Sequence, residues 1–256
     1  MKLTIEGVGK RYRGDFWGLR GFSLELGPGV LGLLGPNGAG KSTLMRILAT
    51  VTRPTEGRAT WDGADIAAEP DRLRAVLGYL PQDFGVYPRV TARDMLGHLA
   101  VLKGITARGE RKEAVERLLR QTNLWDARDR KLGTFSGGMR QRFGIAQALI
   151  GSPRLVIVDE PTAGLDPAER MRFLNLLAEI GESIVVILST HIVEDVSDLC
   201  QQMAILSHGR LLFTGEPRAA IRSLEGQVWT RTIDRDALPR EQVERRVIST
   251  HLAAGR

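Results

Sequence analysis

The sequence predicts an α/β fold built on a parallel sheet, and three stretches carry that prediction. An apolar run at residues 30–34 leads through a glycine-rich turn into a segment whose Leu and Met residues recur at helical spacing. Two further apolar runs, at residues 155–158 and 184–188, flank a helical segment at residues 167–180, which is the pattern of a parallel βαβ unit. With 256 residues, 43% of them hydrophobic, the chain can bury a full core and one smaller subdomain.

The turn after the first apolar run, GPNGAGKST, fits the pattern G-x-x-x-x-G-K-[ST] of a phosphate-binding loop. Glycines let backbone N–H groups close around phosphates, the lysine reaches the terminal ones, and the serine meets Mg²⁺. The helix that follows adds unpaired N–H groups and a partial positive charge. A glycine-rich turn without a ligand is the alternative. The candidate nucleotide-binding residues are Gly35, Pro36, Asn37, Gly38, Ala39, Gly40, Lys41, Ser42 and Thr43.

The apolar run at residues 155–158 leads directly into two acids, Asp159 and Glu160. Ligands of open α/β sheets bind at the carboxyl ends of the strands. Because adjacent residues of a strand point to opposite faces, Asp159 can hold the Mg²⁺ shell while Glu160 faces the attacking water. The alternative is a strand that ends in solvated acids before a turn at Pro161.

A third stretch, FSGGM at residues 135–139, begins a second helix. Ser136, Gly137 and Gly138 precede apolar residues at helical spacing, so free N–H groups again stand at a helix start. A plain helix cap with glycines is the alternative. One chain therefore carries two helix starts that can bind the anion of a single triphosphate.

These three stretches, in this order, resemble the ATP-binding cassette family, and the resemblance covers residues 3–218. It implies a P-loop NTPase core with an antiparallel β subdomain and a helical insertion subdomain at about residues 90–150, all within an ATP-binding domain of residues 1–218. It also implies ATP and Mg²⁺ as cofactors, and a dimer in which the serine-glycine-glycine helix of one subunit closes on the nucleotide held by the other. The family's usual stretch is Leu-Ser-Gly-Gly-Gln, and Phe135 and Met139 replace its outer residues here.

Four further residues are assigned roles by the resemblance. Tyr12 matches the aromatic residue that stacks on adenine, and an ordinary aromatic residue of an edge strand is the alternative. Gln82 matches the glutamine that touches Mg²⁺ and water and senses the transmembrane partner, and it also fits a plain polar loop residue. Asp166 matches the turn that crosses to the other subunit's site, although Asp-Pro also begins ordinary turns. His191 matches the histidine at the γ-phosphate, although a histidine before a helix also occurs as a structural residue.

The residues and the resemblance together predict ATP hydrolysis. Phosphoryl transfer requires the protein mainly to position groups and to neutralise negative charge, which Lys41, Mg²⁺, the loop amides and the opposing Ser136 helix supply. Glu160 is the candidate general base. We therefore expect the catalytic residues to be Glu160, His191, Gln82 and Lys41, and the metal ligands to be Ser42, Gln82 and Asp159.

Composition and charge narrow the function classes. No apolar run approaches the roughly 18 residues that span a bilayer, and the first residues lack the apolar centre of a signal peptide. A single cysteine, Cys200, cannot form an internal disulfide and fits a reducing cytoplasm. The net charge of +6 is spread in short runs interrupted by acids, so we expect a solvated face and no nucleic acid partner. We expect a peripheral protein at the cytoplasmic face of the cell membrane.

Residues 84–88, FGVYP, follow Gln82 and precede a helix predicted to begin near Thr91. In the resembled family this region borders the groove that receives a cytoplasmic helix of a transmembrane subunit. Phe84, Val86 and Tyr87 are therefore the candidates for contact with permease subunits, and plain anchors of the loop are the equal alternative.

The resemblance ends near Arg218, and residues 219–256 form a short C-terminal extension. Within it, residues 227–233 and 247–252 are predicted as short strands around a connector rich in acids and arginines, and residues 253–256 resemble a turn toward another strand. We interpret the extension as an incomplete accessory subdomain, left by truncation.

We interpret the chain as the ATP-hydrolysing subunit of a membrane transporter of the exporter type, paired with a second copy of itself. A soluble ATPase of the same family, such as a cofactor-assembly scaffold, is the alternative. Chromosome-type members need long heptad coiled coils and translation-type members usually carry two cassettes, and neither feature occurs in this sequence. A neighbouring gene with about six apolar segments of bilayer length would decide for transport.

Overall fold

The computed structural model describes residues 1–162 and 165–250. The chain divides into two compact units, Met1–Arg218 and Ala219–Arg256. Residues 163, 164 and 251–256 lie outside the described residues. They include the end of the strand predicted at residues 247–252 and the whole of the turn predicted at residues 253–256.

Four strands near the start of the chain form an antiparallel sheet, as the predicted fold requires. Its strand order is β2-β1-β4-β5, and β1 pairs with both β2 and β4. Leu3, Ile5 and Phe22 from this sheet are buried in the core. The strands are β1 (Leu3–Arg11), β2 (Trp17–Leu26), β4 (Glu56–Trp61) and β5 (Ala64–Asp65).

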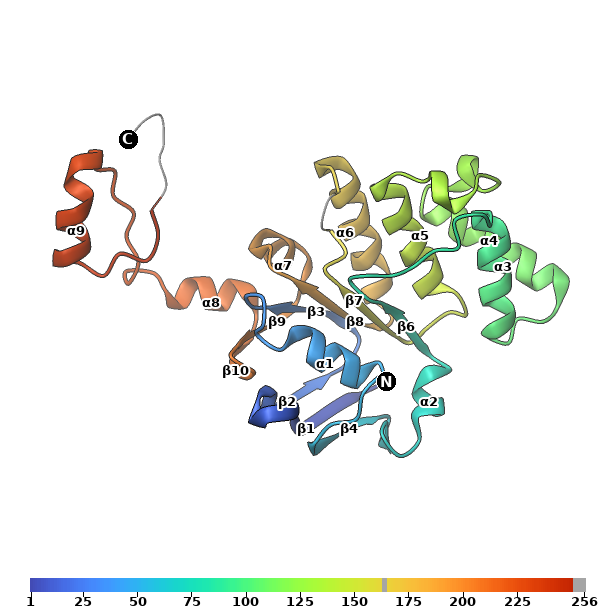
Figure 1. Ribbon diagram of the computed structural model, residues 1–256, viewed down its shortest axis with the longest axis horizontal. Coiled ribbons are helices and arrows are strands. Elements are labelled where there is room, and N and C mark those ends of the chain that lie inside the picture. The colour runs from blue at the N-terminus through green and yellow to red at the C-terminus, as the bar shows by residue number, and fades with distance from the viewer. Residues whose placement is uncertain (163–164, 251–256) are drawn as a thin grey trace. The chain divides into compact units, whose positions relative to one another are not determined.

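A second sheet of six strands forms the centre of the unit Met1–Arg218, in the order β10-β9-β3-β8-β7-β6 (Figure 1). All neighbours in it are parallel except β10, which lies antiparallel to β9. Every residue of β7 and β8 is buried, as expected of parallel strands covered on both faces. The strands are β3 (Gly29–Leu34), β6 (Leu77–Leu80), β7 (Leu155–Asp159), β8 (Val185–Thr190), β9 (Gln202–Ser207) and β10 (Arg210–Gly215).

Helices cover both faces of this sheet. The apolar residues of α1 join one core cluster with Leu31 and Leu33 of β3. The opposite face of β3 lies against α7, because a Cβ added at Gly32 would meet the Val196 side chain. The predicted βαβ unit is present, since β7 and β8 pair in parallel and α6 lies between them in the chain. The helices are α1 (Lys41–Leu48), α2 (Pro70–Arg74), α3 (Ala92–Leu102), α4 (Arg108–Gln121), α5 (Gly137–Leu149), α6 (Pro167–Gly181) and α7 (Val193–Leu199).

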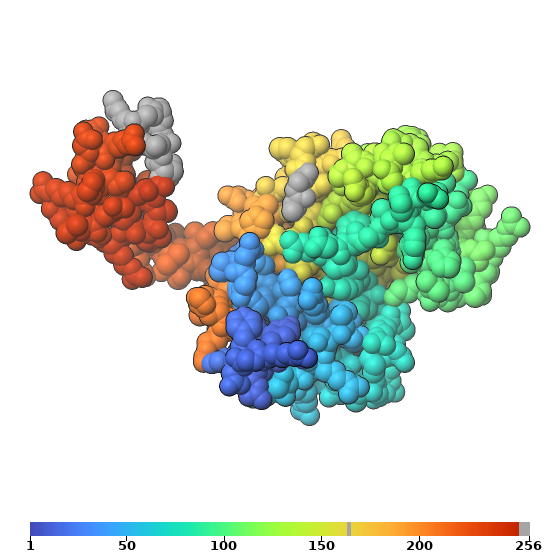
Figure 2. Space-filling model, viewed as in Figure 1, coloured from blue at the N-terminus to red at the C-terminus, as the bar shows by residue number. Residues whose placement is uncertain are grey.

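Between β6 and β7 the chain is mostly helical, and α3, α4 and α5 gather at one end of the unit Met1–Arg218 (Figure 1, Figure 2). Ala114, Leu118 and Leu119 of α4 are buried, as their spacing predicts. α3 begins after Thr91, whose side chain accepts a hydrogen bond from the Asp94 N–H. Single-turn 3₁₀ helices in this unit are η1 (Arg13–Asp15), η2 (Trp125–Ala127) and η3 (Leu132–Thr134).

The C-terminal unit differs from the sequence prediction. Residues 227–233 form no strand, and the connector predicted after them contains a helix instead. Opposite charges at helical spacing explain the helix, because Arg240 pairs with Glu244 and Arg245 pairs with Glu241 across one turn. A strand also needs a neighbour for its hydrogen bonds, and the described part of this unit contains none. The elements are α8 (Pro217–Ser223), which begins in the first unit, η4 (Arg235–Ala237) and α9 (Leu238–Glu244).

Among the described residues, no helix combines the length and the apolar composition that crossing a membrane requires.

Candidate functional site

The glycine-rich loop joins β3 to α1 at the carboxyl end of the parallel sheet. Two of its glycines are required by the backbone. Gly35 and Gly40 have φ of +157° and +106°, and an added Cβ would lie 2.4 Å from the carbonyl oxygens of Leu206 and Gly18, respectively. α1 begins at Lys41, and no side chain caps its first turn. The free N–H groups of that turn therefore face the loop, which is the geometry of an anion site.

The Lys41 side chain is only 6% exposed and lies over the loop. Its ammonium donates hydrogen bonds to the carbonyl oxygens of Gly35 at 2.5 Å and Pro36 at 3.4 Å, and it lies 3.6 Å from Oε1 of Glu160. A buried ammonium needs such oxygens, because an unpaired buried charge is unstable. Phosphate oxygens would suit it equally well, and the role of Lys41 toward phosphate stays a prediction.

Glu160 departs from the predicted alternation of two acids along one strand. β7 ends at Asp159, and Glu160 adopts a left-handed backbone with φ of +50°, which is uncommon for a residue with a side chain. Its N–H donates to the carbonyl oxygen of Ser189, and its Oε2 lies 2.7 Å from Nδ1 of His191. The turn after β7, rather than the pleat of the strand, therefore separates the two acids. Backbone strain of this kind, about 1–3 kcal/mol, is typical of functional sites.

Asp159 is 3% exposed, and its Oδ1 accepts a hydrogen bond from the Ser189 hydroxyl at 2.8 Å. Burial, and then the negative charge of Asp159, raise the pKa of the Tyr79 phenol on β6. The oxygens of Ser42, Gln82 and Asp159 are ligands of the hard type that Mg²⁺ prefers. The described residues contain no cluster of three His, Cys, Asp or Glu side chains that could hold a metal.

Predicted site residues follow four neighbouring strands of the parallel sheet. In the order β3-β8-β7-β6, the glycine-rich loop, His191, Glu160 and Gln82 stand after successive strands. The sheet therefore brings them to one edge. His191 is 60% exposed and Gln82 is also exposed, and among the described residues no hydrogen bond involves the Gln82 side chain.

Tyr12 lies beside the glycine-rich loop. Its hydroxyl is 3.3 Å from Oγ1 of Thr43, and its partly exposed ring stacks against Phe16 with centroids 6.4 Å apart. Phe16 is 62% exposed and was not predicted from the sequence, where its only signal is a second aromatic residue four positions after Tyr12. Two exposed rings next to a phosphate loop are suited to stack on a base, and the adenine contact of Tyr12 stays a prediction.

The segment FSGGM is not brought to the glycine-rich loop by this chain. Ser136 caps α5, accepting a hydrogen bond from the Met139 N–H at 3.2 Å, and both Ser136 and Gly137 are exposed. Among the described residues, no hydrogen bond or ion pair joins this segment to residues 35–43. Phe135, which stands where the resembled family usually has leucine, is 3% exposed and packs edge-on against Phe143.

Asp166 is the N-cap of α6 and accepts a hydrogen bond from the Glu169 N–H at 2.8 Å. Its side chain is exposed, and no contact in the described part of the chain joins it to the glycine-rich loop. Residues 163 and 164 of the same turn lie outside the described residues. The crossing role of Asp166 therefore stays a prediction.

Phe84 serves as an internal anchor of the loop after β6. A Cβ added at Gly144 of α5 would lie 2.6 Å from the Phe84 ring, so the ring rests on that glycine. Val86 is half-buried, whereas Tyr87 is 66% exposed. Of the three candidates for partner contact, Tyr87 is the one whose ring is free to meet another protein.

Asp195 is a residue that the sequence did not single out. Its carboxylate is fully buried and accepts hydrogen bonds from Arg170 Nε at 2.6 Å and from the Thr162 hydroxyl at 2.9 Å. Asp195 thereby ties the turn after β7 to α6 and α7. Burial, and secondarily the charge of Asp195, raise the pKa of Cys200 to about 12. The only signal in the sequence is an acid four positions after His191.

A glycine-rich loop between a strand and a helix of a parallel sheet, together with an antiparallel sheet and a helical insertion, is the architecture of ATP-binding cassettes. The family model described as ABC transporter matches residues 19–163. The chain therefore belongs to the ABC transporter family. Solved ATP-binding cassettes confirm the predicted fold class.

Three similar proteins illustrate the relationship. The probable multidrug ABC transporter ATP-binding protein YbhF of Escherichia coli (strain K12) is 36% identical over 233 residues, which are 90% of this chain and 40% of that relative's length. The daunorubicin/doxorubicin resistance ATP-binding protein DrrA of Streptomyces peucetius is 36% identical over 245 residues, 95% of this chain and 73% of that relative. A solved structure, the dimeric ATP-binding cassette MJ0796 in a post-hydrolysis state with ADP and Pi, is 25% identical with a TM-score of 0.78, covering 84% of this chain and 99% of that one.

Proposed function

We propose that two copies of this chain bind ATP between them, hydrolyse it and power an exporter in a membrane. The main observation behind the proposal is that a single chain does not bring all the predicted site residues together. The glycine-rich loop, Lys41 and Glu160 are assembled within one chain. The Ser136 helix start, equally suited to an anion, is exposed, and among the described residues no hydrogen bond or ion pair joins it to that loop. The dimeric structure of a similar cassette, bound to ADP and Pi, supports a pair of chains.

The chain's own residues suit hydrolysis of the bond between the γ-phosphorus and its bridging oxygen. Lys41 is positioned to exchange the carbonyl oxygens of Gly35 and Pro36 for phosphate oxygens, which neutralises charge on the transferred group. Glu160 would accept the proton of the attacking water, and His191, 2.7 Å from its carboxylate, would orient it. When bound, Mg²⁺ neutralises phosphate charge, with Ser42, Asp159 and Gln82 as its protein ligands.

Export is supported by the names of the relatives. YbhF is named as a probable multidrug transporter protein, DrrA as a drug resistance protein, and a Rhizobium relative as a Nod factor export protein. We therefore place the chain at the cytoplasmic face of the membrane, bound to permease subunits. Tyr87 is the candidate contact, because its ring is exposed beside the helical insertion.

Purification from membranes of the native host tests the transporter function. We expect the tagged full chain to retain a protein with several bilayer-spanning segments, and Tyr87→Ser to reduce that retention while basal ATPase activity is unchanged. Leu212→Ser is the matched control, because Leu212 of β10 is 65% exposed against 66% for Tyr87. A chain that retains no membrane-spanning protein under any condition would contradict a transporter subunit.

A further inference from the structure

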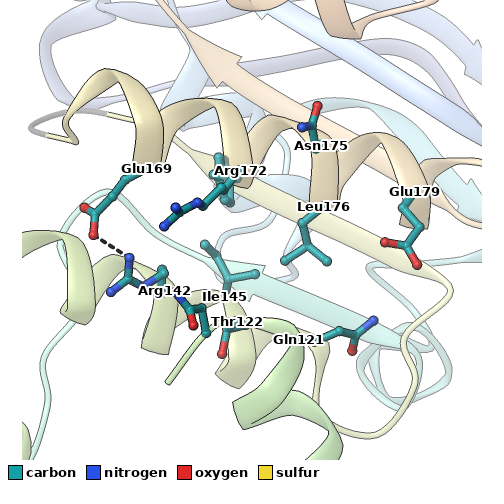
Figure 3. Close-up of a pocket in the computed structure, with 11 residues that line it drawn as sticks. Gln121, Thr122, Arg142, Ile145, Glu169, Arg172, Asn175, Leu176 and Glu179 are labelled. Atoms are coloured by element: carbon teal, nitrogen blue, oxygen red, sulfur yellow. Dashed lines mark hydrogen bonds and ion pairs between the residues drawn. The ribbon is translucent and has the colours of Figure 1, made fainter. Parts of the chain in front are cut away.

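An ion pair joins the two segments that this chain would lend to a partner's site. Glu169 lies in the first turn of α6, and its N–H donates to Oδ1 of Asp166 at 2.8 Å. Its carboxylate accepts a short hydrogen bond from Arg142 of α5, six residues after Ser136, as the dashed line in Figure 3 marks. The first turn of α5, capped by Ser136 (the Ser136 turn), and the first turn of α6, capped by Asp166 (the Asp166 turn), are thereby connected through one pair of side chains.

The same carboxylate lies against the second glycine of the FSGGM segment. A Cβ added at Gly138 would be 1.8 Å from Oε2 of Glu169, whereas one added at Gly137 would meet nothing within 4 Å. The absence of a side chain at Gly138 therefore makes room for Glu169, in addition to leaving the helix start open to an anion. Contact with Gly138 and the pairing with Arg142 hold Glu169 at two points of α5.

The pair is partly removed from water and has little packing beside it. The side chains of Arg142 and Glu169 are 18% and 19% exposed, so their attraction is screened less than that of a surface pair. Next to the pair, a cavity of about 310 Å³ lies between α5, α6 and the end of α4 (Figure 3). Because few side chains pack between α5 and α6 beside this cavity, the ion pair contributes more to holding the two helices in place relative to each other.

We propose that Glu169 and Arg142 are positioning residues that hold the Ser136 turn and the Asp166 turn as one rigid piece. In the described part of the chain, neither side chain makes a hydrogen bond or ion pair with residues 35–43. Their effect is that both turns reach the partner's nucleotide in a fixed relative placement, so that one closure step completes the site. The inference rests on the proposed pairing of two chains around ATP.

ATP-dependent dimer formation of the full chain tests the proposal. In a Glu160→Gln background, which is expected to trap the dimer, Glu169→Gln and Arg142→Gln should each raise the dimer dissociation constant about tenfold, measured by sedimentation in Mg²⁺ and ATP. The double variant should be no weaker than either single one, because the two residues act as a pair. Arg142→Lys, which keeps the charge, should lose much less. ATP affinity of the monomer, measured at a concentration too low for dimers, should not change.

Arg172→Gln is the matched control. Arg172 lies on α6, lines the same cavity and takes part in no ion pair or hydrogen bond among the residues that the structure describes, so its loss should not weaken the dimer. If Glu169→Gln and Arg142→Gln dimerise as well as the Glu160→Gln reference, or their losses add, the positioning role is wrong and the proposed function stands. If the reference itself forms no dimer with ATP, the proposed pairing and this inference fall together.

Discussion

The starts of α1 and α5 are built from similar residues and have different surroundings. Both follow glycine-containing turns with free N–H groups. α1 has no side-chain cap, and its first residue, Lys41, is buried beside Glu160. α5 is capped by its own Ser136, and Ser136 and Gly137 are exposed to solvent.

The difference indicates which molecule each helix start is suited to contact. An uncapped turn enclosed by Gly35, Lys41 and Glu160 leaves its N–H groups for an anion that this chain holds itself. A turn that caps itself is stable without a ligand and can be presented to another molecule. Substitutions at and around the two helix starts test this distinction.

Lys41→Ala should weaken ATP binding by about 100-fold or more, since it removes an ammonium that contacts the loop carbonyls and lies 3.6 Å from Glu160. Titration calorimetry with the isolated chain measures the effect. Lys112→Ala, at an exposed lysine of α4, is the control and should bind normally. Wild-type affinity in Lys41→Ala would show that the glycine-rich loop is not the phosphate site.

Glu160→Gln should keep ATP affinity within a few-fold and lower turnover about 100-fold, because the amide cannot accept the proton of the attacking water. Phosphate release and sedimentation in Mg²⁺ and ATP are the measurements, and a nucleotide-bound dimer should accumulate. Glu194→Gln, at an exposed acid in the first turn of α7, should hydrolyse ATP normally. Substantial residual hydrolysis in Glu160→Gln would point to another base.

The α1 side of the comparison was predictable from sequence because it is local. The strand at residues 29–34, the loop and α1 are contiguous, and their order alone fixes the geometry of the loop. Contacts between distant segments were not predictable. Glu169 meets Arg142 across 27 positions and Asp195 meets Thr162 across 33, and both depend on how helices pack. Phe84 could not be assigned without knowing that Gly144 lies beneath its ring.

The strand predicted at residues 227–233 failed for a related reason. A segment rich in residues that favour strands forms one only where a neighbouring strand supplies hydrogen bonds, and the described part of the C-terminal unit contains no such neighbour. In α9 the charges stand one helical turn apart, a spacing that stabilises a helix locally. In this segment, local ion pairs therefore stabilise a helix.

Gly40→Ala and Gly137→Ala form a matched pair at the two helix starts. Gly40 has φ of +106°, and a Cβ would lie 2.4 Å from the Gly18 carbonyl oxygen, so the free energy of unfolding should fall by at least about 2 kcal/mol. Gly137 lies in α5 with nothing within 4 Å of an added Cβ, so alanine there should raise the free energy of unfolding by up to about 1 kcal/mol. Denaturant unfolding measures both. If both variants lose the same free energy of unfolding, the two helix starts do not differ in the way described.

Two substitutions at Ser136 distinguish its role as the N-cap of α5 from its role toward the partner's nucleotide. Ser136→Ala removes the cap of α5, which should lower the free energy of unfolding by about 1 kcal/mol. It also removes a hydroxyl suited to a phosphate, so turnover should fall about tenfold. ATP binding by the single chain should not change. Ser136→Asp keeps a good cap and therefore the stability, but it places a carboxylate where the partner's phosphates would lie. Its turnover should fall at least as far as that of Ser136→Ala, with normal unfolding. If Ser136→Asp instead hydrolyses ATP at the wild-type rate, the residue is only a cap, and the site does not need a second chain at this helix start.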